Sequence, residues 1–391
     1  MSPVSNAFIS YEASQDMERF YPLHAFVCEG CFLVQLGEFQ APKEIFSADY
    51  AYYSSYSESW LRHSREYVEK MTGRYAYGAA SLIVEIASND GYLLQYFKGK
   101  GVPVLGVEPT ANTAAVAVRK GIPTCQKFFG EGTARQLVAD GKQADLLVGN
   151  NVLAHVPDIN DFVAGMKIAL KPNGVITMEF PHLLRLMENN QFDTIYHEHY
   201  SYFSWMAVER IFASHGLTLF DVEELWTHGG SLRIFGRHVE DESKPITDRV
   251  GAIRQQETDA RLSCLETYKA FQRIVWKTKR ELLKFLITAK EQGKTVVGYG
   301  APAKGNTLLN FCGVGTDLLD YTVDRSPRKQ GTYLPGVHIP IYAPDRIFET
   351  QPDYVLILPW NLKNEVIDQM SGIQSWRGKF VVPIPRVEIL N

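Results

Sequence analysis

The sequence has little of what marks a secreted, membrane or nucleic-acid-binding protein. It carries only five cysteines in 391 residues, which favours reduced thiols over a disulfide framework. No apolar run approaches the roughly 18 residues that a membrane-spanning helix needs. The formal net charge is −4, so no overall basic field favours nucleic acid. Residues 1–6 contain neither a basic nor an apolar stretch, so we expect no signal peptide, no membrane partner and a cytoplasmic protein.

The most unusual stretch that is present spans residues 196–203, where two histidines, a glutamate and three tyrosines fall together. This density predicts proton-transfer chemistry in a partly dry site. A hydrogen-bonded polar strand edge is the structural alternative. In a regular strand, Tyr196 and Glu198 would share one face, with His197 and His199 on the other. A site that uses Tyr196, Glu198 and His199 together therefore requires irregular backbone.

Length and pattern predict an α/β protein of two or three domains, at about 100–200 residues per domain. From Leu82 onward, apolar strand-like runs alternate with helical periodicity, which is typical of a doubly wound, mostly parallel sheet. We expect strands at 82–86, 102–107, 144–149 and 175–180, a turn at 171–174, and helices at 60–74, 92–100, 111–120, 162–170 and 262–290. The predicted division is an N-terminal part at 1–75, a central domain at 76–240, a helical connector at 241–292 and a smaller Rossmann-like domain at 293–391.

The ends of the first predicted strands indicate a nucleoside site, because ligands of such sheets bind there. The turn Ser88-Asn89-Asp90-Gly91 follows the first strand, and Glu108 ends the second, suitably placed to accept ribose hydroxyls. Without G-x-G-x-x-G, a nucleoside lacking a pyrophosphate fits better than a dinucleotide, and S-adenosylmethionine is the obvious one. A fold-typical turn beside a surface glutamate is the alternative. The residues expected at this cofactor site are Glu85, Ser88, Asn89, Asp90, Gly91, Glu108, Pro109, Phe129, Asn150 and Asn151.

A glycine-rich turn at 298–306 carries Lys304 and connects a predicted strand to a predicted helix. Backbone amides and a lysine in this arrangement can hold a phosphate, although the turn is not a Walker A motif. A later strand ends at Trp360-Asn361. These features predict a second nucleotide-binding sheet, with a purely structural Rossmann-like domain as the alternative.

Cys28 and Cys31 lie at C-x-x-C spacing between two alternating apolar runs, as in a zinc knuckle. A redox pair is the rival interpretation, but no βαβ pattern surrounds it. A structural zinc site needs four ligands, and no second cysteine pair is present. His24 is a candidate third ligand, and a core or surface histidine is the alternative for it.

Six blocks, in order, make the sequence resemble the deoxysugar C-methyltransferases of nucleotide-sugar biosynthesis. They are DYAYYSS (49–55), VEIASNDG (84–91), NVLAHVP (151–157), FDTIYHEH (192–199), THGGSLR (227–233) and GYGAPAKGN (298–306). The resemblance covers nearly the whole chain. It implies an N-terminal zinc domain, a central S-adenosylmethionine-dependent domain and a C-terminal Rossmann-like domain. It also implies methylation at carbon 3 of an NDP-4-keto-deoxysugar.

The resemblance places the catalytic base at His199, with Tyr196, Glu198, His155 and Tyr50 beside it. For the nucleotide-linked sugar it implies Tyr52, His228, Gly300, Lys304, Asn306 and Trp360. The family's zinc site uses two C-x-x-C pairs, of which this sequence carries only the second, so the resemblance implies a missing N-terminal stretch and an incomplete zinc site at Cys28 and Cys31.

The expected chemistry explains these residue types. A 4-keto group acidifies the hydrogen on carbon 3, and histidine, with an ordinary pKa of about 6.5, suits its removal. Tyr196 or His155 could donate a hydrogen bond to the enolate oxygen, and Glu198 could hold the tautomer of His199. An O- or N-methyltransferase on a sugar or other small molecule, or a non-catalytic nucleotide-sugar-binding protein, are the alternatives.

Overall fold

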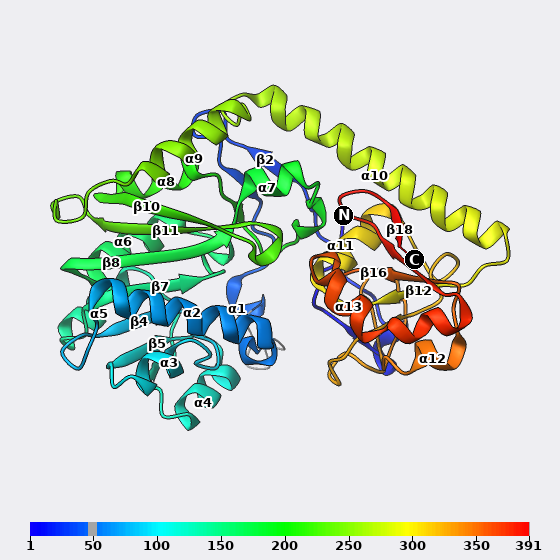
Figure 1. Cartoon of the computed structure of the whole chain (residues 1–391), viewed down its shortest axis with the longest axis horizontal. Coiled ribbons are helices and arrows are strands. Elements are labelled where there is room, and N and C mark those ends of the chain that lie inside the picture. Colours follow the sequence, from blue (N-terminus) through cyan, green and yellow to red (C-terminus); the bar gives the residue numbers. More distant parts are fainter. Residues whose placement is uncertain (46–52, 391) are drawn as a thin grey trace.

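The structure is a computed structural model that describes residues 1–45 and 53–390. A central α/β body and a C-terminal α/β body lie side by side in Figure 1. A long helix, α10 (Leu265–Glu291), runs along one edge of both bodies and joins them. Within residues 1–45 and 53–390, no helix is both long enough and apolar enough to cross a membrane.

The central sheet runs in the order β10-β11-β8-β7-β4-β5-β6. Its strands from β8 to β6 are parallel, as the sequence predicts, whereas β11 and β10 add an antiparallel hairpin that is not among the predicted strands. The predicted turn at 171–174 is wrong, because β8 already begins at Leu170 and pairs with β7 across a local irregularity. The strands are Ile83–Ile86 (β4), Val104–Val107 (β5), Thr124–Cys125 (β6), Ala144–Asn150 (β7), Leu170–Pro181 (β8), Leu217–Leu225 (β10) and Ser231–His238 (β11).

Helices cover both faces of this sheet, because successive strand residues point to opposite sides. Ile83 and Leu146 belong to the core on the face of α2 and α3, whereas Val84 and Leu147 belong to the core with α5, α6 and α8. Each such buried side chain contributes about 1.5–3 kcal/mol. Helix α2 begins where the Ser57 hydroxyl accepts an N–H of the first turn. The helices of this body are Glu58–Tyr75 (α2), Leu94–Gly99 (α3), Ala111–Arg119 (α4), Glu131–Ala139 (α5), Ile159–Ala169 (α6), Leu183–Glu188 (α7), Trp205–Ser214 (α8) and Asp248–Asp259 (α9).

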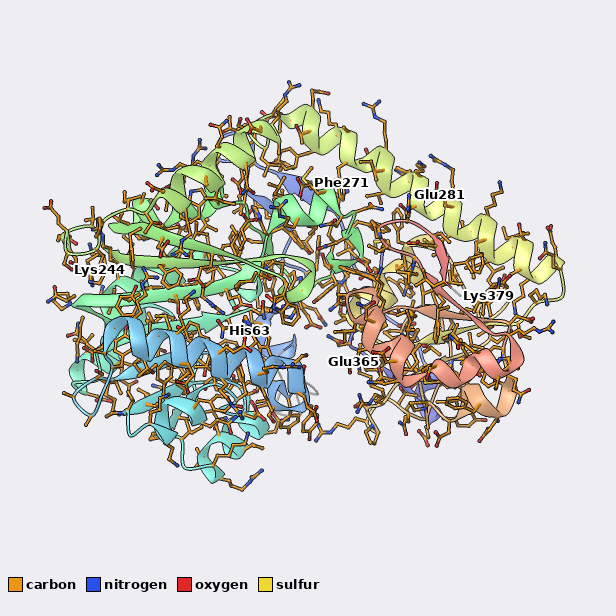
Figure 2. All side chains as sticks on the ribbon, in the orientation of Figure 1. His63, Lys244, Phe271, Glu281, Glu365 and Lys379 are labelled. Carbon is orange, nitrogen blue, oxygen red and sulfur yellow. The ribbon has the colours of Figure 1, made fainter. Side chains whose placement is uncertain are left out.

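The C-terminal sheet runs in the order β15-β13-β12-β16-β17-β18 and is parallel except for β18. Leu282 and Leu286 from the second half of α10 belong to its core. Phe271, nearer the start of α10 and labelled in Figure 2, packs with the cluster that contains Leu183 of α7. The predicted helix over 262–290 is therefore confirmed, and it is anchored in both bodies. The elements of this body are Val296–Tyr299 (β12), Ala303–Cys312 (α11), Thr322–Val323 (β13), Ile341–Tyr342 (β15), Arg346–Thr350 (α12), Tyr354–Ile357 (β16), Lys363–Gln369 (α13), Lys379–Val382 (β17) and Glu388–Leu390 (β18).

The N-terminal part of the chain touches both bodies. Strand β1 (Ile9–Ser10) pairs with β14 (Thr332–Tyr333), so the N-terminus lies over the C-terminal body in Figure 1. The chain then forms β2 (Ala25–Val27) and β3 (Val34–Leu36), and β3 pairs with β9 (Ser201–Tyr202) of the central part. A short helix, α1, follows at Pro42–Ile45. The N-terminal residues are thus positioned to close a space between the two bodies.

Candidate active site

One cavity of about 1160 Å³ collects residues from all three parts of the chain. The N-terminal segment contributes Val4, Asn6, Ala7 and Phe8, and the start of α11 contributes Pro302, Ala303 and Lys304. Much of the rest of the wall comes from the carboxyl ends of β4, β5 and β7 and from the histidine-rich segment before β9, and the loop between β10 and β11 adds His228. Pockets for a single small ligand measure about 300–1,000 Å³. This cavity therefore has room for a nucleoside and a second molecule together.

Glu108, at the end of β5, forms one polar end of the cavity. Its Oε2 accepts a hydrogen bond from the Asn89 N–H at 2.9 Å, and its Oε1 accepts from the Thr110 N–H at 2.9 Å and the Thr110 hydroxyl at 2.5 Å. Burial raises the pKa of Glu108, and the Thr110 and Asn89 hydrogen bonds oppose that shift. The side chain is therefore rigid, and Oε2 keeps one acceptor position for a ligand.

The turn after β4 is shaped so that its backbone can lie close to a ligand. Asn89 has φ 48° and Gly91 has φ 75°, conformations that favour glycine or asparagine. A side chain at position 91 would also place Cβ 2.3 Å from Ile122 Cδ1. The turn therefore depends on glycine at this position for steric as well as conformational reasons.

The predicted cofactor residues separate into a layer that lines the cavity and a layer behind it. Behind the wall, Asp90 pairs with Lys120 at 3.2 Å, and burial raises the pKa of Glu85 well above its usual range. The Tyr92 hydroxyl faces Glu85, and Tyr92 itself lines the cavity. The lining residues are Asn89, Glu108, Pro109, Phe129, Asn150 and Asn151, whereas Glu85, Ser88, Asp90 and Gly91 are buried beside them.

The histidine-rich segment has the irregular backbone that a shared site requires. The His199 N–H donates to the Tyr196 carbonyl at 2.9 Å, which closes a turn across 196–199. Tyr196, Glu198 and His199 all line the cavity as a result. His197 points elsewhere, with its Nε2 at 3.2 Å from the Pro22 carbonyl oxygen.

His199 and His155 form the centre of this segment, with ring centroids 4.7 Å apart. His199 Nδ1 lies 3.0 Å from the Thr194 carbonyl oxygen, and His155 Nδ1 lies 2.7 Å from the Glu198 carbonyl oxygen. A carbonyl oxygen only accepts, so each Nδ1 carries the hydrogen and each Nε2 carries a lone pair. Burial lowers the pKa of His199 well below its ordinary value and lowers that of His155 to about 4. Both rings are therefore neutral at physiological pH.

The Glu198 carboxyl does not hold the tautomer of His199, so that expectation is wrong. The Thr194 carbonyl takes this role. Glu198 Oε1 instead accepts a hydrogen bond from Asn6 Nδ2 at 2.5 Å, and burial raises the pKa of Glu198. The carboxyl thus connects the N-terminal segment to the histidine-rich segment.

Lys304 enters the cavity from the first turn of α11. Its Nζ donates to Asn361 Oδ1 at 2.7 Å and lies 4.2 Å from the centroid of the Trp360 ring. Trp360 Nε1 donates to the buried Asp193 Oδ2 at 2.7 Å. Trp360 therefore supports the lysine from behind; like Gly300 and Asn306, it is not a lining residue.

His228 lines the cavity from the loop between β10 and β11, where it has φ 54°. The neighbouring Thr227 hydroxyl donates to Glu179 Oε1 at 2.8 Å. Glu179 also contacts Arg233 at 2.6 Å and His63 at 2.8 Å, and His63 lies on α2 in Figure 2. Burial would raise the pKa of Glu179, but these partners lower it to about 2. The buried ion cluster fixes the base of the His228 loop.

Comparison with known proteins matches most of the chain. A family model described as "C-methyltransferase C-terminal domain" matches residues 226–385, one described as "Methyltransferase domain" matches 62–222, and one described as "Putative zinc binding domain" matches 1–46. The C-methyltransferase NovU of Streptomyces niveus is 33% identical over 390 residues, which cover 100% of this chain and 92% of that protein. The chain belongs to the S-adenosylmethionine-dependent C-methyltransferase family.

Solved methyltransferase structures are similar to part of this C-methyltransferase. The magnesium protoporphyrin IX methyltransferase (ChlM) from Synechocystis PCC 6803 with bound SAM has 13% identity and a TM-score of 0.34, covering 45% of this chain and 78% of that one. An S-adenosylmethionine-dependent methyltransferase from Clostridium acetobutylicum has 11% identity and a TM-score of 0.37, covering 46% and 92%. These identities and TM-scores are too low to support a conclusion about the site.

The residues of the C-methyltransferase fit S-adenosylmethionine at the β4–β5 end of the cavity. Glu108 keeps an acceptor position for a ribose hydroxyl, and the 87–91 turn lets backbone approach a nucleoside.

The residues around the predicted zinc site do not fit a structural zinc ion. Cys28 and Cys31 flank a tight turn in which the Phe32 N–H donates to the Cys28 carbonyl at 2.9 Å. Within residues 1–45 and 53–390, no group of three or more His, Cys, Asp or Glu side chains could hold a metal.

Two predicted residues, Tyr50 and Tyr52, lie outside the described residues. The sequence analysis missed other lining residues of the C-methyltransferase. Trp60 and Tyr92 are aromatic residues close to predicted strand or loop ends, so their position gave some signal. Asn6 and Phe8 gave no such signal, because the residues that surround them in the cavity are far away from them in the sequence. The lining residues not predicted include Asn6, Phe8, Lys43, Trp60, Tyr92, Lys127 and Lys329.

Proposed function

We propose that this C-methyltransferase methylates carbon 3 of an NDP-4-keto-deoxysugar. The observation that carries the proposal is His199, a half-buried neutral imidazole whose Nε2 lone pair is available in the cavity that also contains Glu108. A carbon becomes nucleophilic only after it loses a proton, and a neutral histidine is a suitable base for that step. The ketone beside carbon 3 makes its hydrogen acidic enough to be removed.

One end of the cavity would bind the cofactor, and the other end would remove the proton from the sugar. At one end, Glu108 would accept a hydrogen bond from the adenosine ribose and Asn89 would line the same pocket. S-adenosylmethionine supplies an electrophilic methyl group when it is bound. At the other end, His199 would take the proton from carbon 3, and His155 and Tyr196 pack against its ring. The half-buried setting of His199 and Tyr196 would limit the access of water that could reprotonate the carbon.

The nucleotide of the sugar would lie along the wall formed by the N-terminal segment and the C-terminal body. Two lysines besides Lys304 line that region. Lys329 lies 5.2 Å from the centroid of the Phe8 ring and donates to the Ala301 carbonyl at 2.9 Å. Lys43 lines the cavity from α1. Ammonium groups of this kind can contact a diphosphate as point charges. His228 lines the cavity from the central body, where it could contact the sugar.

The test is incubation with S-adenosylmethionine and a panel of NDP-4-keto-deoxysugars in deuterated water, with product analysis by mass spectrometry and carbon NMR. We expect a new carbon–carbon bond at carbon 3 and, without S-adenosylmethionine, exchange of the carbon 3 hydrogen for deuterium. Methylation at oxygen or nitrogen would contradict the proposal. Binding of S-adenosylmethionine with no turnover of any keto sugar would favour a non-catalytic binding protein.

A further inference from the structure

The two histidines leave one requirement of the proposed reaction unmet. When a proton leaves carbon 3, negative charge collects on the carbonyl oxygen, and that oxygen needs a hydrogen-bond donor. The Nδ1 hydrogens of His199 and His155 are already donated to the carbonyls of Thr194 and Glu198. Each neutral ring therefore has only a lone pair on Nε2, so neither can donate to the oxygen. The geometry of His155 therefore does not favour it as this donor. Tyr196, the other predicted donor, also lines the cavity, but an ammonium group adds a Coulomb attraction to the enolate that a neutral hydroxyl lacks.

We propose that the ammonium group of Lys304 is the donor that stabilises the enolate oxygen. This inference rests on the proposed function, because it assigns a role within the same reaction. Lys304 lines the same cavity as His199 but comes from the C-terminal body. The base and the positive charge would then be supplied by different bodies of the protein.

The surroundings of Lys304 hold its ammonium group without using all its hydrogens. Nζ donates one hydrogen to Asn361 at 2.7 Å, and an ammonium group has three to give. The Trp360 ring lies under the charge at 4.2 Å from its centroid, an attractive cation–π arrangement. Burial lowers the pKa of Lys304 to about 8, and the negative charge of the buried Asp193, which accepts the Trp360 indole N–H, opposes that shift and favours the ammonium form. Up to two hydrogens remain for a ligand.

The contacts of α11 tie this lysine to the segment that carries the base. The Thr307 hydroxyl, one turn further along α11, donates to the Ile195 carbonyl at 3.2 Å. Ile195 follows Thr194, whose carbonyl orients His199. Burial is the main cause of the lowered pKa of His199, and the positive charge of Lys304 lowers it a little further. A cation close to a neutral base is the arrangement that enolate formation needs, because charge develops between the two.

The proposed step balances without any further reactant. The bond between carbon 3 and its hydrogen breaks, and the proton moves to His199 Nε2. The electron pair forms the double bond between carbons 3 and 4, and the carbonyl pair moves to the oxygen, which accepts a hydrogen bond from Lys304. The pair of the carbon 3–carbon 4 double bond would then form the bond to the methyl group while a pair on the oxygen restores the carbonyl, and the carbon–sulfur bond would break with the sulfur keeping its pair.

The rival role for Lys304 is contact with a phosphate of the nucleotide, as the glycine-rich turn predicts. Both roles use the ammonium charge, but they affect different measurements. A phosphate contact contributes to binding of the nucleotide in the ground state and in the transition state alike. An enolate contact strengthens only as charge develops on the oxygen, so it changes the rate of proton removal at saturating sugar.

The experiment compares Lys304→Met, Lys304→Arg and the control Lys363→Met, which removes an exposed lysine of α13 in the same body. Three quantities are measured in each full-length variant: the rate of carbon 3 hydrogen exchange at saturating sugar, the dissociation constant of the nucleoside diphosphate alone, and that of S-adenosylmethionine. Loss of one such donor typically costs about 10²–10³-fold in rate. We expect Lys304→Met to lose exchange by this factor with both dissociation constants within about threefold of wild type, and Lys304→Arg to recover part of the rate.

The outcomes separate this inference from the proposed function. If wild type exchanges the hydrogen and Lys304→Met exchanges it equally fast, the inference is wrong and the proposed function stands. If Lys304→Met weakens nucleoside diphosphate binding more than tenfold with its saturated exchange rate intact, Lys304 is a phosphate ligand instead. If wild type exchanges no hydrogen from any 4-keto-deoxysugar, the proposed function fails and this inference fails with it.

Discussion

Replacing Glu108 should weaken S-adenosylmethionine binding by an amount that its hydrogen bonds define. Its two carboxylate oxygens offer about four acceptor positions. Asn89 and Thr110 fill three of them, so one position on Oε2 is left for a ribose hydroxyl. A hydrogen bond to a charged group contributes about 1.5–3 kcal/mol. Since about 1.4 kcal/mol corresponds to a tenfold change, Glu108→Ala should raise the dissociation constant about 10- to 150-fold.

The isosteric variant Glu108→Gln should lose nearly as much. A carboxamide has one oxygen and one NH₂ group. Thr110 donates two hydrogen bonds on one side of the carboxylate and Asn89 donates one on the other. If the amide oxygen faces Thr110, the NH₂ group meets the Asn89 N–H and the ribose acceptor is gone. The alternative orientation leaves the two Thr110 donors facing the NH₂ group, so neither orientation satisfies every donor.

Isothermal titration calorimetry of S-adenosylmethionine with both variants measures this effect. The control is Glu69→Ala, since Glu69 is an exposed carboxylate on α2 that pairs only with Lys100 among the described residues. We expect no change in its affinity. Wild-type affinity in Glu108→Ala would refute the assignment of the nucleoside to the β4–β5 end of the cavity.

Three further predictions concern the base, the pH dependence and the metal. His199→Asn should slow carbon 3 hydrogen exchange about 10²–10⁴-fold, whereas His197→Asn, which alters a side chain outside the cavity, should change it little; wild-type exchange in His199→Asn would place the base elsewhere. Because burial lowers the pKa of His199, its neutral form persists in acid, so exchange should stay level through pH 6.5 and fall only below it. Burial also lowers the pKa of Lys304 to about 8, so if Lys304 acts as an ammonium group, exchange should fall above about pH 8 as well. A flat alkaline profile would count against that role. The purified protein should contain well under one equivalent of zinc by atomic emission spectroscopy, since Cys28 and Cys31 supply two of the four ligands that a structural site needs. One tightly held equivalent of zinc would show that other residues complete the site.

The sequence alone predicts that Asn89 and Glu108 lie together at one end of the cavity, because this follows from the order of the parallel strands. Asn89 and Glu108 follow two apolar runs, and parallel strands bring their carboxyl ends to one edge. The pairing of β4 with β5 therefore brings together two residues that are about 20 positions apart. The antiparallel β10–β11 hairpin is harder to predict, because residues on both faces of these strands are buried and the alternation of polar and apolar residues is lost.

At the histidine-rich end of the cavity, the sequence predicts the residue types but not their geometry. The histidines, Tyr196 and Glu198 are visible as a cluster in the sequence. Whether Glu198 or a backbone carbonyl orients His199 depends on the turn at 196–199, and a backbone carbonyl has no signature in the sequence. The bond between Asn6 and Glu198 joins residues 192 positions apart, so no local pattern indicates it.

The pairing of β1 with β14 has a consequence for how the protein forms during synthesis. Ile9 pairs with Tyr333, which leaves the ribosome more than 300 residues later. At about 5–20 residues per second, the first strand waits roughly 15–65 s for its partner to be made. The central body can fold in that interval, since its sheet closes with β11 at His238. The N-terminal residues that line the cavity can therefore take their final places only near the end of translation, so a nascent chain that stops before β14 would carry the histidine cluster with one wall of its site open to solvent.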